Sequence, residues 1–349
     1  MAAPTAQMAA PSDECFHGGY VLPDHPEPPP YELPQADPFV PDITSPLLSK
    51  RCAGNQDWAD WRWVPSSRQC ASGLRGRTYY EVCPQLRGRR LFYVGDSTQF
   101  EMFVSMGMLM GGRRDMLNVS TGSWRSHTFR RLCNGSATLS WARADFLHER
   151  SEPPPAEQRG FSSFTWDQLA GFDVVVLNTG IHMLNDTTLA RRTHDLARRF
   201  AAMPASRTVV WRTTVPGHDN CARAERPLDA RYEPSARGPF GWQHVERQNG
   251  LVTAILRRVA PRVRLLDAFA LSNARADRHV ASKTRLMVTE DGKRVTSAVM
   301  DCLHYCLPSA VDTWNVLLVK ALLGAGGRET QGDADETQRR RTARKPDAV

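Results

Sequence analysis

The chain has 349 residues, of which 41% are hydrophobic, so it can bury one large core with a smaller appendage, and its length does not require two domains. Its formal net charge is +8, and much of the excess lies between Arg339 and Lys345. No nucleic-acid recognition motif accompanies this charge, which favours a solvated surface over a nucleic-acid partner. No stretch approaches the roughly 20 apolar residues of a membrane helix.

Residues 1–50 are rich in Pro and Ala and show no hydrophobic periodicity, which predicts a flexible leader. The first residues show no signal peptide. Eight cysteines without a paired CxxC pattern make zinc the weaker interpretation, and the sequons at Asn118, Asn134 and Asn185 favour an oxidising compartment. The alternatives are a chain recorded without its true start and a cytosolic protein with free thiols.

Residues 51–88 have a different character, because tryptophans crowd between cysteines with few aliphatic residues around them. We expect a disulfide-stapled collar that lies against the main domain. Trp58, Trp61 and Trp63 have two interpretations. They pack into the core, or their indole faces stack on sugar rings.

An apolar run at residues 91–94 ends abruptly in Gly95-Asp96-Ser97, and a helical pattern follows. This pattern predicts a buried strand, a tight turn and a helix. Open α/β folds place their ligands at the carboxyl ends of strands, and a helix N-terminus stabilises negative charge, so Ser97 is a candidate nucleophile. The alternative is that Ser97 only caps the helix.

Strands and helices alternate along the rest of the chain. Segments 123–130 and 137–146 are expected to be extended around a Cys133-Asn134-Gly135 turn. The pattern then predicts strands at 172–177, 208–211 and 263–267, helices at 187–203, 242–259 and 312–323, and a disordered charged tail at 325–349.

This alternation predicts an α/β fold, a parallel sheet between two helix layers, over residues 89–324. The loops at the carboxyl ends of the predicted strands contain Ser97, Asn178 and Arg212. Because these loops meet at one edge of the sheet, the three residues are considered together.

Asp301-Cys302-Leu303-His304 stands before the last helix, and Cys306 follows it. Asp301 and His304 are spaced to lie on one side of a turn, where the carboxylate holds one imidazole nitrogen and the other nitrogen faces a serine. A surface pair and a metal-ligand fragment are the alternatives. Cys302 and Cys306 are each expected to tie this segment to another part of the fold.

The spaced blocks Gly95-Asp96-Ser97, Asn178-Thr179-Gly180-x-His182 and Asp301-x-x-His304 resemble those of SGNH/GDSL-type esterases. The block from Asp301 to Asn315 more closely resembles the C-terminal block of the trichome birefringence-like proteins, the plant polysaccharide O-acetyltransferases of the PC-esterase family. The similarity extends to Trp61-Arg62-Trp63, Arg212-Thr213-Thr214 and the segment 271–279, and covers residues 52–323.

The resemblance implies an SGNH-like three-layer α/β/α fold and a catalytic triad of Ser97, His304 and Asp301. It also implies acetyl transfer to cell-wall glycan hydroxyls in the Golgi lumen from a type II membrane anchor, although the chain shows no anchor. Plant members usually follow the serine with an arginine and an asparagine of the oxyanion pocket, where this chain has Phe100 and Glu101.

The resulting hypothesis is a double displacement through acetyl-Ser97, with the oxyanion held by the Ser97 N–H and the Asn178 amide. No bound cofactor or metal is expected; the acetyl donor, such as acetyl-CoA, is a co-substrate, and the acceptor is a polysaccharide or oligosaccharide. A carbohydrate acetylesterase and a degenerate glycan-binding protein are the alternatives. Further substrate-binding candidates are Asp96, Gly180, His182, Arg212 and His279, with a structural role as the alternative for His182, His218 and His279.

Overall fold

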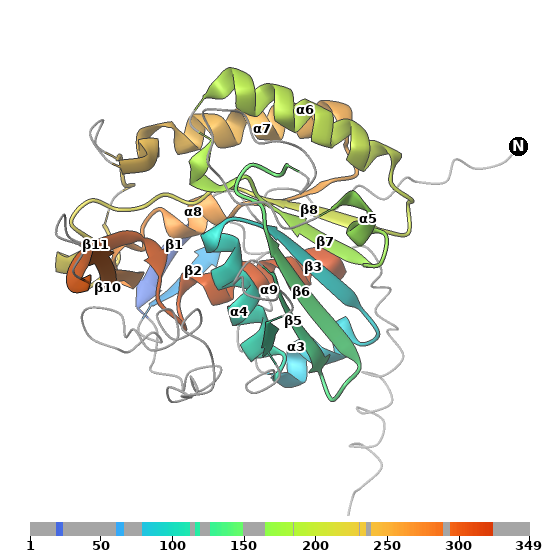
Figure 1. Cartoon of the computed structure of the whole chain (residues 1–349), viewed down its shortest axis with the longest axis horizontal. Helices are drawn as coiled ribbons and strands as arrows, with labels where there is room; N and C mark the ends of the chain where they lie inside the picture. The colour runs from blue at the N-terminus through green and yellow to red at the C-terminus, as the bar shows by residue number, and fades with distance from the viewer. Residues whose placement is uncertain are drawn as a thin grey trace, which may run out of the picture.

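The structure, a computed structural model, describes residues 19–23, 61–65, 79–111, 116–118, 126–148, 165–183, 185–229, 231–234, 239–288 and 294–323. A seven-stranded sheet forms its centre, with the strand order β4-β5-β6-β3-β7-β8-β9 (Figure 1). These strands are β3 (Arg90–Gly95), β4 (Met116–Asn118), β5 (Ser126–Leu132), β6 (Ala137–Arg143), β7 (Val174–Leu177), β8 (Thr208–Arg212) and β9 (Arg264–Leu266).

Five neighbouring strands of this sheet, from β6 to β9, run parallel, and β5 and β4 continue it antiparallel at one edge. The central strand β3 lies between β6 and β7, which explains its continuous apolar sequence, because both of its faces are covered. The predicted mostly parallel α/β fold is therefore confirmed. The segment 137–146 supplies a further parallel strand beside β3.

Helices α6 (Asp186–Ala202) and α7 (Val245–Val259) cover one face of the sheet (Figure 1). Side chains of β7 alternate between the two faces, as a strand requires. Those that point to this side pack with the two helices. This core includes Val175, Leu177, Leu196, Phe200, Trp211 and Leu256.

Helices α3 (Tyr79–Leu86), α4 (Ser97–Leu109) and α9 (Ala310–Leu323) cover the other face (Figure 1). The larger core lies between these helices and the sheet, and α4 is buried along almost its whole length. This core includes Tyr93, Val174, Val176, Met102, Trp314 and Leu317. The two helix layers complete the three-layer α/β/α arrangement that the resemblance implied.

Short helical segments connect these elements, and all but the first of them follow the carboxyl end of a parallel strand. They are α5 (Trp166–Leu169), η3 (Gly180–His182), η4 (Cys221–Arg223), η5 (Pro239–His244), α8 (Ala268–Ser272) and η6 (Ala276–Arg278). The helix predicted from residue 242 begins as the 3-10 turn η5 and becomes α-helical only at Val245.

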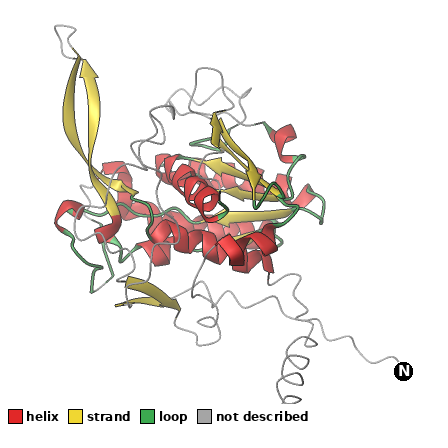
Figure 2. Cartoon of the chain, turned by 90° about the horizontal axis from the view of Figure 1, so that it is seen from below, coloured by secondary structure: helices red, strands yellow, loops and turns green. Residues whose placement is uncertain are grey.

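A long antiparallel hairpin of β10 (His279–Val288) and β11 (Arg294–Tyr305) was not predicted. It pairs with itself rather than with the central sheet and extends away from the three layers (Figure 2). Asp301 and His304, expected on a turn, lie at the end of β11. The final strand residues thus carry two of the candidate catalytic side chains.

The predicted leader and collar are described only in part. Strand β1 (Gly19–Pro23), inside the predicted leader, pairs with β2 (Trp61–Pro65), inside the predicted collar. The collar also contributes α3, and the Cys83–Cys133 disulfide joins that helix to the turn between β5 and β6. The rest of the leader, residues 51–60 and 66–78 of the collar, and the predicted tail at 325–349 lie outside the described residues.

Within the described ranges, no helix has the length and apolar character needed to cross a lipid bilayer.

Candidate active site

Ser97 is the first residue of α4, directly after β3 and the turn residue Asp96. Asp96 is the N-cap of the helix: its Oδ1 accepts hydrogen bonds from the N–H groups of Thr98 and Gln99, at 3.0 and 3.2 Å. A carboxylate at this position stabilises the free donors and the positive end of the helix. Asp96 therefore caps the helix, and Ser97 does not.

Arg212, at the end of β8, supports this turn from inside the protein. Its guanidinium donates to Gln99 Oε1 and Thr98 Oγ1, both at 2.8 Å, and lies 3.9 Å from Asp96 Oδ1. Burial alone would raise the pKa of Asp96, but the charges of Arg212 and His182 and hydrogen bonds to the carboxylate lower it to about 2. Asp96 is therefore ionised at neutral pH, and the positive charge of Arg212 balances its negative charge.

His304 brings the end of β11 to the serine turn. Its Nε2 lies 2.7 Å from Ser97 Oγ, and its Nδ1 lies 3.0 and 2.9 Å from the two oxygens of Asp301. An ionised carboxylate only accepts hydrogen bonds, so Nδ1 carries the proton of the neutral ring and Nε2 accepts the Ser97 hydroxyl. The three side chains thus form a continuous nucleophile, base and carboxylate chain.

One protein family matches the second half of the chain. Residues 192–321 match the PC-Esterase family, a GDSL/SGNH-like acyl-esterase family found in Pmr5 and Cas1p. Residues 192–321 are thus similar to a PC-esterase domain, and this match covers less than half of the chain. The matched range includes Arg212, Asp301 and His304, whereas Ser97 lies before it.

Longer stretches of the chain are similar to curated plant proteins. The chain is 25% identical over 332 residues to trichome birefringence-like 35 of Arabidopsis thaliana, covering 80% of this chain and 71% of that protein. It is 24% identical over 317 residues to trichome birefringence-like 6 of the same plant (76% and 62%). It is 25% identical over 314 residues to xylan O-acetyltransferase 3 of Oryza sativa subsp. japonica (76% and 67%). The aligned part thus covers roughly two thirds of the length of each relative. For trichome birefringence-like 6, the share is below two thirds.

Asn178 follows β7 and lies directly behind Gly95. Its Nδ2 donates to Asp96 Oδ1 at 3.1 Å, and within the described residues its Oδ1 has no hydrogen-bond partner. A Cβ on Gly95 would lie 1.8 Å from that oxygen, so only glycine fits here. The structure shows Asn178 holding the turn, and its role in the oxyanion site stays a prediction.

Three of the predicted substrate-binding residues lie in the protein interior. Asp96, Arg212 and His279 are at most 1% exposed, and their polar groups contact other protein groups. The structure therefore places them as supports of the serine turn and of His304 rather than as contacts for a substrate. A sequence does not distinguish these roles, because both put polar residues at strand ends.

Gly180 and His182 form the 3-10 turn η3 after β7, where the sequence predicted a loop of the site. The His182 side chain is 25% exposed, and its Nε2 lies 3.9 Å from Asp145 Oδ1. Asp145 also accepts from Arg143 Nε at 2.7 Å. Arg143 and Asp145 were not predicted as site residues. Arg143 ends β6 and Asp145 follows it, at the same sheet edge as Ser97, and this position is the signal that could have found them.

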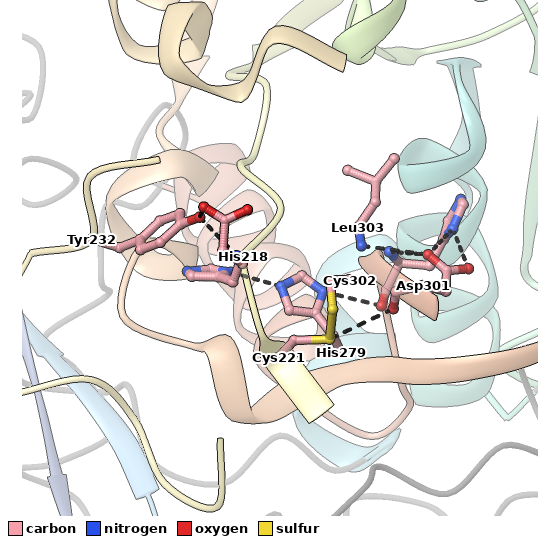
Figure 3. Close-up of a disulfide and its surroundings, with 9 residues drawn as sticks. His218, Cys221, Tyr232, His279, Asp301, Cys302 and Leu303 are labelled. Carbon is pink, nitrogen blue, oxygen red and sulfur yellow. Dashed lines mark hydrogen bonds and ion pairs between the residues drawn. A yellow bond between two sulfur atoms is a disulfide. The ribbon is translucent and has the colours of Figure 1, made fainter. Parts of the chain in front are cut away.

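His218 and His279 form a buried pair beside the base (Figure 3). His218 Nδ1 lies 2.7 Å from His279 Nε2, and the two outer ring nitrogens lie 2.8 Å from the Asn273 carbonyl and 3.1 Å from the His304 carbonyl. Burial lowers the pKa of His218 to about 4 and that of His279 well below its usual range. Two neutral rings carry two N–H groups for three contacts, so one contact is always without a proton. These contacts fit the structural role that the sequence offered for His218 as the alternative to a role in catalysis.

A disulfide between Cys221 and Cys302 ties β11 to the loop after β8 (Figure 3). His218 N–H also donates to the Cys302 carbonyl at 2.9 Å. The expectation that Cys302 links the histidine segment to another part of the fold is confirmed, and Cys306 is disulfide-bonded as well. The strand that carries Asp301 and His304 is thereby fixed beside the central sheet.

Removing this disulfide by the double substitution Cys221→Ser and Cys302→Ser should reduce both stability and turnover. A cross-link across 81 residues limits the unfolded chain and stabilises the fold by about 4 kcal/mol. We expect a melting temperature lower by about 10 °C, and a lower kcat because β11 is less firmly held. Thermal denaturation and initial rates measure the two effects.

The matched control is the double substitution Cys83→Ser and Cys133→Ser, which removes the disulfide between α3 and the β5–β6 turn. It should lower the melting temperature with little change in kcat well below that temperature. A Cys221/Cys302 variant with unchanged turnover would show that the disulfide does not hold the base.

In the described part of the chain, no three His, Cys, Asp or Glu side chains are grouped as metal ligands would be.

Proposed function

We propose that this chain is an O-acetyltransferase that moves an acetyl group through acetyl-Ser97 onto a polysaccharide hydroxyl. The observation that carries the proposal is the 2.7 Å contact between Ser97 Oγ and His304 Nε2, with Asp301 behind the ring. The PC-esterase match and the similarity to proteins named xylan O-acetyltransferases support the acyl chemistry and the type of acceptor.

The first half of the reaction acylates the serine. Ser97 Oγ attacks the acetyl carbonyl carbon of the donor while its proton passes to His304 Nε2. The carbonyl electrons move to oxygen, and the Ser97 N–H at the start of α4 donates to that oxyanion. When the intermediate collapses, the bond to the donor breaks, and the leaving group takes the proton from His304. Asp301 stabilises the imidazolium throughout.

The second half returns the serine to its free state. A sugar hydroxyl gives its proton to His304 Nε2 as its oxygen attacks the acetyl-serine carbonyl. Collapse of this second intermediate breaks the bond to Ser97 Oγ, which recovers the proton. The products are an acetylated sugar and the free enzyme.

Phe100 and Glu101, which replace the usual plant residues, do not enter the contacts of Ser97 with His304. Phe100 packs on Trp141, with ring centroids 4.7 Å apart, and Glu101 is buried under β11. Both side chains extend from α4 into the protein interior, and neither displaces Ser97 from His304. This supports an enzyme over a degenerate glycan-binding protein.

The rest of the assignment is also proposed. The acetyl donor is a co-substrate such as acetyl-CoA rather than a bound cofactor. The acceptor is an oligosaccharide or polysaccharide of the plant cell-wall type, and the working compartment is the Golgi lumen or secretory pathway. The disulfides support an oxidising compartment, and the names of the plant relatives support the acceptor.

A product assay tests the proposal. The purified chain is mixed with an acetyl ester donor, with and without xylan oligosaccharides, and free acetate and acetylated sugar are both measured. We expect acetylated sugar to form at a rate well above that in a protein-free mixture, while release of acetate falls when acceptor is present.

Acetate as the only product at every acceptor concentration would identify an acetylesterase, the alternative favoured by the acyl-esterase description of the family. Binding of the sugar without either product would identify a glycan-binding protein. Either result would contradict acetyl transfer.

A further inference from the structure

The peptide group between His304 and Tyr305 is held at both edges by buried side chains. Its N–H donates to Glu101 Oε1 at 3.0 Å, and its carbonyl oxygen lies 3.1 Å from His279 Nδ1. Glu101 belongs to α4, the helix that begins with Ser97. One side chain of the nucleophile's helix therefore contacts the backbone of the base directly.

Glu101 is four residues after Ser97, so the two side chains lie on the same side of α4. Both face the end of β11: Ser97 Oγ contacts the His304 ring, and Glu101 contacts the next peptide N–H. Two contacts one helical turn apart fix the distance and the tilt between the helix and the strand. The disulfide at Cys302 and the His279 ring hold β11 from other sides, and the Glu101 contact adds a second point of attachment to α4 itself.

The Glu101 side chain is fully buried, and within the described residues its Oε2 has no hydrogen-bond partner. Burial raises the pKa of its carboxyl well above the usual range, and the nearby carboxylates of Asp301 and Asp96 raise it further, while the Tyr305 N–H and the Arg212 charge oppose this effect. A buried unpaired carboxylate costs several kcal/mol, whereas an unpaired neutral hydroxyl costs about 1–3 kcal/mol. The neutral acid is therefore the favoured form at neutral pH.

We propose that Glu101, as a neutral carboxylic acid, is a positioning residue that holds the His304 backbone at the correct distance from Ser97. The proposal rests on the proposed serine chemistry and adds to it a residue that does not touch the substrate. Neutrality matters because an ionised Glu101 would place a second negative charge near Asp301 and His304. That charge would favour the cationic form of the imidazole, which has no lone pair to accept the Ser97 proton.

Three variants test this role. Glu101→Gln keeps an acceptor oxygen and the size of the side chain without a charge, Glu101→Leu removes the acceptor, and Ser105→Ala is the matched control. Ser105 is one turn further along α4, is also buried, and binds Asp312 of α9 instead of β11. Its loss should reduce stability without moving His304.

Two rates are measured for each variant: turnover of an acetyl ester, and covalent labelling of Ser97 by a fluorophosphonate. Labelling needs the activated serine and no sugar acceptor. We expect Glu101→Gln to stay within about threefold of the wild type, with the acid limb of its pH–rate profile at the same pH. For Glu101→Leu, we expect kcat and the labelling rate to fall about 10- to 100-fold with little change in KM, because small displacements of catalytic groups have effects of this size. Ser105→Ala should lose thermal stability but keep both rates.

Equal rates in Glu101→Leu and the wild type would overturn the positioning role. A Glu101→Gln variant as slow as Glu101→Leu, or with a displaced acid limb, would show that the charge of Glu101 is needed, which also overturns it. If the wild-type protein is labelled but forms no acetylated sugar, the proposed transferase activity is contradicted. The labelling rates of the Glu101 variants then still test the positioning role. Wild-type protein that is not labelled at Ser97 would contradict both.

Discussion

Replacing Ser97 with alanine should lower kcat for acetyl transfer by at least about 10⁴-fold, because it removes the oxygen atom that the proposed mechanism acetylates. The hydroxyl is half-buried, and its one described partner is His304 Nε2, so the variant should fold normally. Initial rates of acetylated-sugar formation measure the loss. Mass spectrometry of the wild-type peptide that contains Ser97 should also show one added acetyl group after a pulse of donor.

The control for this substitution is Ser206→Ala, an exposed serine in the loop between α6 and β8. It removes the same atom away from the site and should keep the wild-type rate and the acetyl label on Ser97. If Ser97→Ala keeps more than a few per cent of the wild-type activity, or the label lies on another residue, Ser97 is not the nucleophile.

The second large effect is expected for Asp301→Asn, with kcat lower by about 10⁴-fold. The carboxylate of Asp301 accepts from His304 Nδ1 and from the His304 N–H, at 3.0 and 3.2 Å. An asparagine in its place offers N–H donors to Nδ1, which favours the ring tautomer with its proton on Nε2. That tautomer has no lone pair for the Ser97 hydroxyl. The pH–rate profile should lose its acid limb or move it, and circular dichroism should show an intact fold.

Asp173→Asn is the matched control, because Asp173 also accepts a backbone N–H, from Arg90 at 2.8 Å, but lies at the opposite end of β3 and β7. It should change kcat by less than about twofold. An Asp301→Asn enzyme with near wild-type turnover would show that the carboxylate does not set the tautomer of His304.

Much of the architecture follows from local sequence patterns. The apolar runs before Gly95, Asn178 and Arg212 became β3, β7 and β8, because a strand covered on both faces has to be apolar throughout. The hairpin β10–β11 was not predicted. Its strands pair with each other rather than with the sheet, so no neighbouring helix pattern marks them.

The candidate site shows the same division. The residue types of Ser97, Asp301 and His304, and their places at the ends of apolar runs, were predictable from chemistry and spacing. Their mutual contact spans 207 residues of sequence and required the fold. The roles of Asp96, Arg212 and His279 changed from substrate contacts to buried supports, since burial depends on which layer covers each strand end.

The sequence alone therefore determined the layered α/β fold and the residues that could form a triad, because periodicity and residue chemistry are local properties of the chain. Only the tertiary structure decided that Asn178 binds Asp96, that Cys221 pairs with Cys302, and that Glu101 contacts the peptide after His304. These contacts join distant segments, and many pairings of polar residues satisfy the same sequence pattern. Packing of the helix layers against one sheet selects among them.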